Sequence, residues 1–465
     1  MVMQKIRKYI ILFLVVLFSS SLTFSAEKKE PLELLNADSS EVFLEENNIV
    51  VNLSGNVSFK HGETNLSSQQ AVWYKTLGQV VFTEKVAISD SVQTLKADRV
   101  VYYQNTKKLI ADGNVNYYNL KEDLFVLGGK GEYDRENKYL VVTENPELVS
   151  DYNQKGDLTR IQGDTMEYYT ETQVGIAKGN VRIEKGETKA FCKRAEFYNK
   201  EQRILLLGNP VANKKEDEIT GEKLEIFLKD NKVDWTQAEN SKASHKEYLD
   251  SLKTKYNESF ISGKKIYFFF EDEKLSQVKV EKNATSLYFS SVKDTLSQGK
   301  NEVSGDTINL FFSEEKLKNI HISGGVIGTY YSPTGEKDSL GKAKEDTVKY
   351  SCEQGNYLVD NDLMTLEGNS KLEYQELSLN SFKIIYNSEK QVLEAEGDTT
   401  QKDSLGNFLG EPVLIDGKEQ ITGQRMSYDL NTKKGKIKGG ESQYEEGVYF
   451  GKRIRKKRDR PSGAN

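Results

Sequence analysis

Apolar and polar residues alternate along most of this sequence, in short segments separated by turns. Ile266 and Phe268 would lie on one face of such a segment, with Tyr267 on the other. Period-two alternation is typical of β-strands. The chain is therefore predicted to be all-β, and helical periodicity is confined to a polar segment around His245–Lys255.

The predicted strands belong to a repeated unit. Leu95–Tyr118 aligns with Ile161–Ile183 without a gap, which brings Asp98 to the position of Asp164 and Gly113-Asn114 to that of Gly179-Asn180. A repeat at this period indicates units that bury their apolar faces by stacking on their neighbours. Weaker copies have their leading polar residue near Gln70, Glu132, Glu196, Glu222, Lys264, Asp306, Ser381 and Gln424.

Tight turns with asparagine join the two strands of each unit. Asn105-Thr106, Asn137-Lys138 and Asn199-Lys200 each follow a strand aromatic, and asparagine tolerates the left-handed backbone of short turns. Such turns favour stacked antiparallel hairpins over a parallel β-helix, whose strands need longer crossovers. Apolar residues on both faces of some strands indicate an interior apolar trough.

The first residues have the composition of an export signal. Lys5, Arg7 and Lys8 precede the apolar run Ile10–Phe18, and small residues follow as far as Ala26, which is typical of a cleaved signal peptide. The whole chain has a net charge of −6. Its body is acidic and its last residues are basic, so we expect no nucleic-acid groove. The expected segments are a signal peptide (1–26), repeats (27–240), a polar insertion (241–258), repeats (259–450) and a basic disordered tail (451–465).

The candidate chemistry favours a protein that is not an enzyme and has no cofactor or metal. The acidic residues recur at one position of the unit, as a structural residue does, whereas a catalytic pair is unique. His61, His245 and His321 lack the spacing of a zinc site, and Cys192 and Cys352 are several repeats apart and are expected to be separate thiols. A carbohydrate-active β-helix enzyme is the alternative that the abundant carboxylates leave open.

The recurring motif is apolar-x-(Gly/Ala)-(Asp/Glu)-x-apolar-x-Tyr, followed by an asparagine turn and Gly-Asn-Val. Over Leu34–Phe450 this pattern resembles the OstA-like family, which includes the lipopolysaccharide-transport protein LptA and the N-terminal domain of LptD. Gly423–Lys456 is similar to the junction at which LptD continues into its outer-membrane barrel. We therefore expect either a relative without the barrel or an LptD-like protein cut before it.

The resemblance implies an elongated open β-jelly-roll of V-shaped cross-section, a β-taco solenoid, located in the periplasm and in contact with the outer membrane. It implies a bridge that carries lipopolysaccharide or a related glycolipid toward that membrane, with the acyl chains in the trough. The implied partners are Lpt-type inner-membrane proteins and outer-membrane barrel proteins, which would dock on open sheet edges, and end-to-end self-association. An exported structural or adhesive β-solenoid without a lipid ligand is the alternative from another class.

Alternation selects candidate site residues but leaves open which strand face lines the trough, because a slip of one residue inverts every assignment. The candidate trough residues are Val57, Phe59, Val100, Tyr102, Met166, Tyr168, Val181, Ile183, Leu224, Ile226, Ile266, Phe268, Ile308, Leu310, Ile384 and Tyr386. The candidate partner-docking residues are Met426, Tyr428, Tyr444 and Tyr449.

Overall fold

A computed structural model describes most of the chain. The described residues are 31–45, 47–121, 123–150, 158–230, 232–289, 299–314, 316–337, 343–387, 389–444 and 447–456. Nearly all of them form β-strands, which confirms the all-β prediction, and the helical turns among them are the 3-10 segments Asn199–Glu201 and Val359–Asn361. No helix in the described ranges is long and apolar enough to cross a membrane. The expected signal peptide lies outside these ranges.

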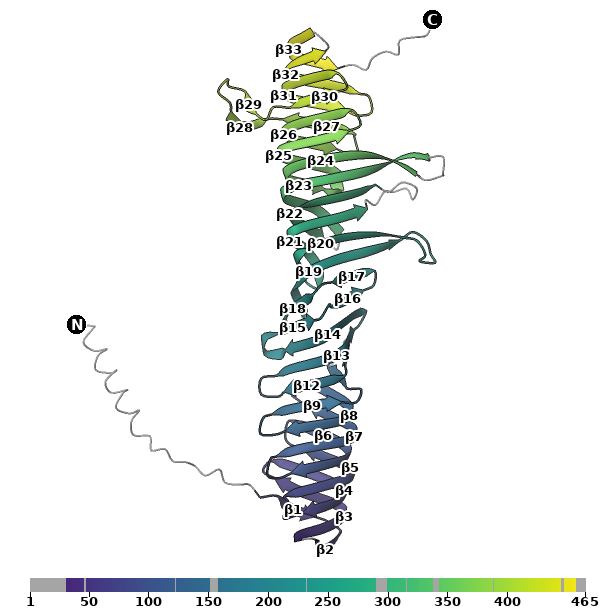
Figure 1. The fold of residues 1–465 in the computed structure, drawn as a ribbon, viewed down its shortest axis with the longest axis vertical. Coiled ribbons are helices and arrows are strands. Elements are labelled where there is room, and N and C mark those ends of the chain that lie inside the picture. Colours follow the sequence, from purple (N-terminus) through teal and green to yellow (C-terminus); the bar gives the residue numbers. More distant parts are fainter. Residues whose placement is uncertain are drawn as a thin grey trace, which may run out of the picture. The chain divides into compact units, whose positions relative to one another are not determined.

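The chain divides after Gly113 into two compact units, whose strands are labelled in Figure 1. The strands of the first unit are β1 (Glu33–Asn36), β2 (Ser39–Glu45), β3 (Asn48–His61), β4 (Thr64–Tyr74), β5 (Gln79–Ser89) and β6 (Gln93–Tyr103). Strand β7 (Lys108–Asn119) crosses the boundary.

The first unit is an antiparallel meander with an aromatic core. Strands β1 and β2 both pair with β3, and β3 to β6 pair in chain order. The ring of Phe59 meets Trp73 and Phe82 edge-on, with centroids 5.3 and 5.6 Å apart. Two residues after Phe59 on β3, the buried His61 imidazole is hydrogen-bonded to the Tyr102 hydroxyl. The apolar side chains of this unit therefore pack on one another.

The second unit contains the remaining strands. Those before residue 230 are β8 (Leu124–Asp134), β9 (Tyr139–Thr143), β10 (Glu147–Ser150), β11 (Thr159–Gln162), β12 (Thr165–Tyr169), β13 (Val174–Lys185), β14 (Thr188–Tyr198), β15 (Arg203–Leu207), β16 (Val211–Lys214), β17 (Asp217–Thr220) and β18 (Lys223–Lys229). Those after it are β19 (Lys232–Tyr248), β20 (Tyr256–Glu271), β21 (Lys274–Phe289), β22 (Lys300–Ser313), β23 (Lys316–Lys337), β24 (Ala343–Leu358), β25 (Leu363–Tyr374), β26 (Leu377–Asn387), β27 (Val392–Glu396), β28 (Asp398–Lys402), β29 (Phe408–Leu409), β30 (Val413–Asp416), β31 (Glu419–Asp429), β32 (Lys434–Tyr444) and β33 (Gly447–Lys456).

Strands of the second unit form two antiparallel ladders, which we call wall A and wall B. Wall A contains β9, β12, β15, β18 and β27, and wall B contains β10, β11, β16, β17 and β30. A longer strand such as β13 contributes one half to each wall, because it pairs with both β12 and β11. Antiparallel pairing throughout these ladders contradicts the parallel β-helix alternative and confirms stacked hairpins.

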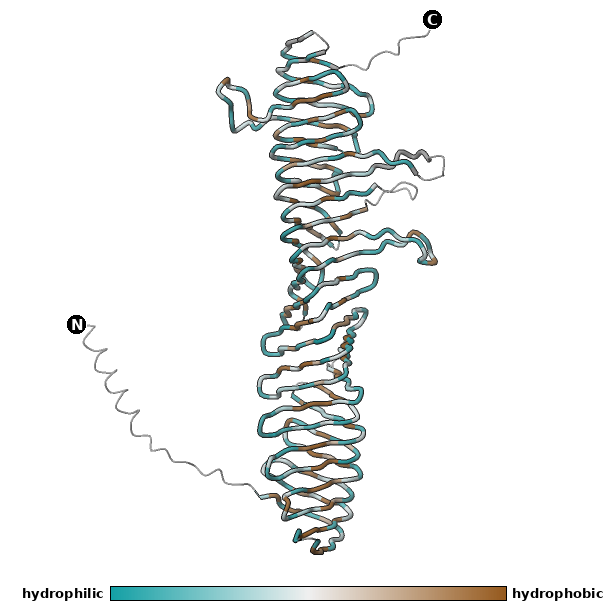
Figure 2. The backbone as a smooth tube through the Cα atoms, viewed as in Figure 1, coloured by the Kyte–Doolittle hydropathy of each residue, from teal (hydrophilic) through white to brown (hydrophobic). Residues whose placement is uncertain are grey.

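Apolar side chains from both walls form one core. Ile266 and Ile308 of wall A belong to the same buried cluster as Ile261 and Val303 of wall B. Brown and teal segments alternate along the strands in Figure 2, as expected when one face of each wall is turned toward the core. The two walls are therefore the halves of a folded sheet whose inner faces are apolar.

A strand passes from one wall to the other at a corner made of two residues with left-handed backbone. In β13 these residues are Gly179 (φ 71°) and Asn180 (φ 47°), and the register with β14 shifts there. The Asn180 amide donates to the Asp164 carboxylate, with an Nδ2–Oδ2 distance of 3.1 Å. Asp164, between β11 and β12, thus holds this corner, which gives the recurring acid of the repeat a structural role.

Other corners repeat this arrangement. The acid and the corner residue that it contacts are Asp38 with Asn56, Glu222 with Asn240, Glu353 with Asn369, Asp98 with Gly113 and Asp306 with Gly324. Glu132 and Glu196 do not have this role, because Gly129 and Lys193 lie closest to the corners at Glu144 and Gly208. The leading residues predicted for these two copies, Glu132 and Glu196, therefore lie three residues after the residues that occupy this position.

Alanine at a corner glycine should destabilise the fold by an amount that depends on the neighbouring acid. Gly325→Ala should lower the free energy of unfolding by about 1 kcal/mol, the cost of left-handed backbone, since an added Cβ there meets nothing within 4 Å. Gly179→Ala should cost more, because its Cβ would lie 2.1 Å from Asp164 Oδ2. Urea denaturation measures both changes, and equal losses would contradict a role for the acid.

Two expected segment boundaries differ from the structure. Residues 241–258 were expected to be a polar insertion with helical character. They continue β19 and β20 into a hairpin that projects from the sheet (Figure 1), because Ser241–Tyr248 pairs with Tyr256–Gly263 as antiparallel strands. The expected disordered tail begins with residues of β33, where Ile454 pairs with Ile437 and packs on the core. Residues 457–465 lie outside the described ranges.

Candidate functional site

The candidate trough residues lie on the inner faces of the sheets. All of them are buried except Ile183, Ile226 and Leu310, which are half-buried. Val57, Phe59, Val100 and Tyr102 belong to the first unit and the others to the second. The structure brings five of them, in β20, β22 and β26, into one core cluster: Ile266, Phe268, Ile308, Ile384 and Tyr386.

Cross-strand register distinguishes the two faces that alternation alone leaves equivalent. Phe268 pairs with Thr236 and Val278, and this row is buried. Phe269 pairs with Trp235 on the opposite face, where the sheet carries polar and charged residues. Phe268 is therefore an inner residue and Phe269 an outer one.

The inner faces are partly uncovered between β13 and β19, a stretch that we call the open section. On both walls most apolar residues in the second inward row from the corners become half-buried here, whereas Tyr168 and Phe268 in that row of wall A are buried. In the first inward row, Leu206 and Leu224 stay buried throughout. On wall B two of the half-buried residues are alanines, Ala212 and Ala243. The half-buried inner residues of the open section are Ile183, Phe197, Ile204, Ala212, Ile219, Ile226 and Ala243.

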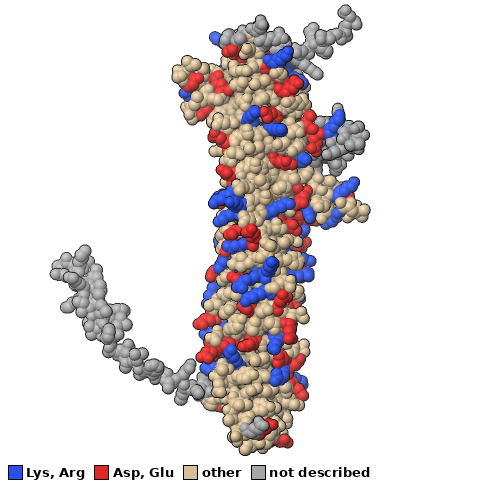
Figure 3. All heavy atoms as spheres, in the orientation of Figure 1, with Lys and Arg blue, Asp and Glu red and all other residues tan. Residues whose placement is uncertain are grey.

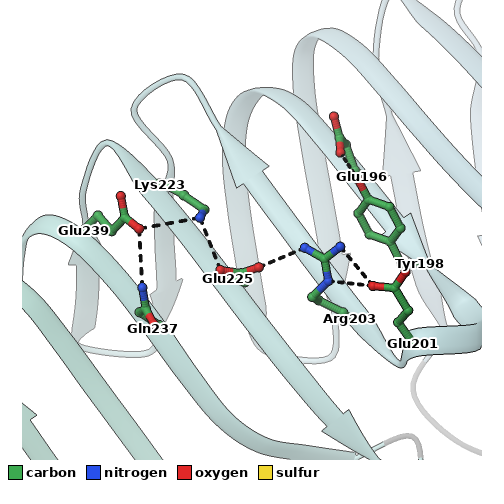
Figure 4. Close-up of polar contacts among 8 residues, drawn as sticks. All are labelled: Glu196, Tyr198, Glu201, Arg203, Lys223, Glu225, Gln237 and Glu239. Atoms are coloured by element: carbon green, nitrogen blue, oxygen red, sulfur yellow. Dashed lines mark hydrogen bonds and ion pairs between the residues drawn. The ribbon is translucent and has the colours of Figure 1, made fainter.

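The outer face of the same strands carries a ladder of ion pairs (Figure 4). The Arg203 guanidinium donates to Glu225 at 2.8 Å and to Glu201 at 3.0 Å, and it lies 4.0 Å from the centroid of the Tyr198 ring. Lys223 is within 3.3 Å of Glu225. Acidic and basic residues are interspersed over the visible surface in Figure 3. The charges of this region pair with one another on the outside, and the inner face stays apolar.

The three histidines have different surroundings. His61 is buried beside Tyr102, whereas His245 is exposed, with its Nδ1 2.7 Å from the Asp217 carboxylate. His321 on β23 lies opposite Asn309 and Asn356 in the register of the neighbouring strands. The residues that the structure describes contain no group of three or more His, Cys, Asp or Glu side chains that could hold a metal ion.

Both cysteines are free and buried, on β14 and β24. Burial raises the pKa of the Cys192 and Cys352 thiols from 9.0 to about 11. The folded state thus favours the neutral thiol, so this contribution to stability is complete below pH 9 and is lost as the pH rises toward 11.

A thiol reagent should therefore leave the native protein unmodified at pH 8 and react with both cysteines in guanidinium chloride. The urea midpoint should fall between pH 9 and 11, and it should fall less in a Cys192→Ala/Cys352→Ala variant. Rapid labelling of the native protein would contradict the burial of the thiols.

The candidate docking residues lie near the end of the second unit. Met426 and Tyr428 are buried on the inner side of β31, and the Tyr428 hydroxyl donates to Asp416 at 3.2 Å. Tyr444 is the last residue of β32 and Tyr449 lies in β33. Docking at this end would therefore use the backbone edge of β33 in preference to the Met426 and Tyr428 side chains.

Comparison with known proteins identifies part of the chain. Residues 35–174 match the profile of the family described as LptA/(LptD N-terminal domain) LPS transport protein. These residues are an LPS transport family domain. The LPS transport domain contains the first six candidate trough residues, from Val57 to Tyr168. The corner-and-wall repeat continues beyond it through the open section.

Solved structures also match this chain, and the structure of LptH is one of them. The crystal structure of LptH, the LptA homologous periplasmic component of the lipopolysaccharide transport device from Pseudomonas aeruginosa, is 13% identical and covers 34% of this chain and 93% of its own, with a TM-score of 0.25. No curated protein matches the sequence.

Proposed function

We propose that this protein carries lipopolysaccharide or a related glycolipid through the periplasm toward the outer membrane, with the acyl chains held between inner sheet faces. The observation that carries the proposal is the LPS transport domain at residues 35–174. The same two-wall repeat after residue 174 would extend the path. Such carriage requires no chemistry from the chain, so the proposal is a scaffold and not an enzyme.

The energetics of the inner faces support this proposal. Removing one acyl methylene from water is worth about 0.8 kcal/mol, so several chains would be held firmly by apolar walls. The open section is where we place their first contact, because Ile204 and Ile226 on wall A and Ile219 on wall B are already half-exposed there. The candidate residues that are buried in the free protein would line the path once lipid separates the walls.

Open sheet edges supply the proposed docking sites. Strand β2 pairs with β3 among the described strands, and its Val42 and Leu44 are 66% and 73% exposed. Unpaired N–H and C=O groups on such an edge can accept a further strand. We assign this edge to an inner-membrane partner and the edge of β33 to an outer-membrane barrel or a second copy of the chain, with residues 1–26 acting as a cleaved signal peptide.

Lipid analysis of the purified protein tests the proposal. The mature protein, isolated from the periplasm of cells that make lipopolysaccharide, should contain lipid A acyl chains detectable by mass spectrometry. It should also bind a fluorescent fatty acid after the bound lipid has been removed. Folded protein that contains no lipid and binds no acyl probe would contradict the proposal.

A second candidate, an exported structural or adhesive β-solenoid without a ligand, is favoured by one observation. In the first unit the inner aromatic residues already pack together, and Phe59 and Phe82 are fully buried. The lipid analysis above distinguishes the two candidates, because the structural solenoid predicts a negative result in both measurements.

A further inference from the structure

Tyrosines line the inner faces of β21 to β26 at the strand ends farthest from the corners. On wall B one cross-strand row contains Tyr288, Tyr330 and Tyr374, each separated from the next by a single strand. On wall A the matching row contains Tyr357 and Tyr386, on the two sides of Met364. We call these five residues the tyrosine seam.

The two rows of the tyrosine seam lie close to each other across the core. Tyr330 and Tyr374 pack against the buried cluster that includes Tyr386. Desolvation by burial, and next the proximity of Tyr330, raise the pKa of Tyr386 to about 12. Desolvation also raises the pKa of Tyr357, with contributions from Asp362 and then from Tyr288 and Tyr330. A side chain of wall B is therefore near both tyrosines of wall A.

The hydroxyl groups of the seam meet polar partners while the rings cover the apolar core. The Tyr357 hydroxyl donates to Asp362 and the Tyr374 hydroxyl to Asp346, both at 2.9 Å. The Tyr330 ring lies over Gly299, where a Cβ would be 2.5 Å from its hydroxyl oxygen. Packing and hydrogen bonds thus fix the rings with one apolar side and one polar end.

The open section differs from the tyrosine seam at the equivalent position. Its wall A row holds Phe197, Ile204 and Ile226, which have no hydrogen-bonding group in their side chains. Ile219 on wall B is also apolar, but it lies in the row of Gly328, one inward-facing row nearer the corners than Tyr330. The wall A row of the open section offers a ligand apolar contacts only, which suits hydrocarbon. The seam offers both ring surface and hydroxyl groups, as tyrosines do at the boundary between apolar and polar phases.

We propose that the tyrosine seam binds the part of a glycolipid where its acyl chains join the polar head. The rings would cover the first methylenes, and the hydroxyls would hydrogen-bond to acyl carbonyl, sugar hydroxyl or phosphate oxygens. This inference rests on the proposed function and adds a subsite to it. A ligand with acyl chains but no hydrogen-bonding head would gain nothing from the seam hydroxyls.

A triple variant, Tyr330→Phe/Tyr357→Phe/Tyr386→Phe, tests the seam in the full mature chain because it removes hydroxyls and keeps the rings. The matched control, Tyr169→Phe/Tyr267→Phe/Tyr331→Phe, changes three outer-face tyrosines. Binding is measured for lipid A, for phosphatidylglycerol and for the fluorescent hydrocarbon diphenylhexatriene, which has no polar head. We expect the seam variant to bind lipid A roughly tenfold more weakly, with hydrocarbon binding unchanged, and the control to match the wild type.

Each outcome bears on one claim. A loss for lipid A alone supports the seam and assigns its hydroxyls to the saccharide, and an equal loss for phosphatidylglycerol supports it and assigns them to the acyl esters or the phosphate that both lipids contain. Unchanged lipid A binding by the seam variant overturns the subsite but leaves the proposed function standing. Equal weakening of lipid A and the hydrocarbon probe also overturns it, because packing alone would then be affected. A wild type that binds none of the probes overturns both.

Discussion

A photoreactive side chain at position 268 should crosslink to lipopolysaccharide in cells, whereas the same side chain at position 269 should not. Phe268 is an inner residue, 6% exposed, and Phe269 is on the outer face of the same strand. Acyl chains held between the walls would therefore be within reach of one position and separated from the other by the sheet. Immunoblotting for lipopolysaccharide in the crosslinked product gives an all-or-none readout.

The adjacent pair Ile226 and Phe227 provides a matched control in the open section. Ile226 is inner and half-buried, so a bulky photoreactive group fits there with less strain than in the core, and Phe227 stacks on Trp235 outside, with centroids 3.8 Å apart. Position 226 should crosslink and position 227 should not. Crosslinks at the outer positions alone would mean that the lipid travels along the outside of the sheet.

Phe59→Ala should be among the most destabilising single substitutions in the chain. Phe59 is fully buried between the rings of Trp73 and Phe82, and removing a buried phenylalanine ring typically costs about 3–5 kcal/mol because of the cavity that remains. Chemical denaturation of the mature protein, followed by tryptophan fluorescence, would report the loss directly, since Trp73 is in contact with the ring that is removed.

The same substitution at Phe43 provides the control for Phe59. Phe43 is on β2 of the same unit and is 42% exposed, so Phe43→Ala should change the stability by no more than about 0.5 kcal/mol. If Phe43 contributes to docking at the β2 edge, this variant should lose its partner without losing stability. Similar destabilisation by both substitutions would show that the first unit is not packed around Phe59.

Local patterns were sufficient to predict the strand type and the repeat. The alternation around Ile266–Phe268 and the asparagine turns are properties of a few neighbouring residues, so they can be recognised without knowledge of the fold. The choice between Phe268 and Phe269 as the inner residue is not local, because it depends on pairing with β19 and β21. The sequence accordingly selected candidate residues on the inner face but could not establish that face.

The tyrosine seam and the misaligned copies show what the sequence did not reveal. Tyr330 and Tyr386 are far apart in sequence and meet only because the corners fold the two walls together. At corners such as Gly179-Asn180, one strand has two residues outside the paired register and its partner has one, here Lys193. The single residue shifts the phase of the alternation in the partner strand. Glu132 and Glu196 were aligned without that shift. Of the seam tyrosines only Tyr386 was among the candidate trough residues.

The corners also accommodate inserted segments. Between β27 and β30 the chain leaves the sheet at Gly397, forms the small hairpin β28–β29 and returns, yet β27 and β30 both pair with β26 and β31 as regular wall strands do. A corner is thus a modular junction at which an excursion can be grafted while the ladders on either side keep their register. Gene duplication of whole hairpins between corners would likewise let this scaffold change its span in discrete steps.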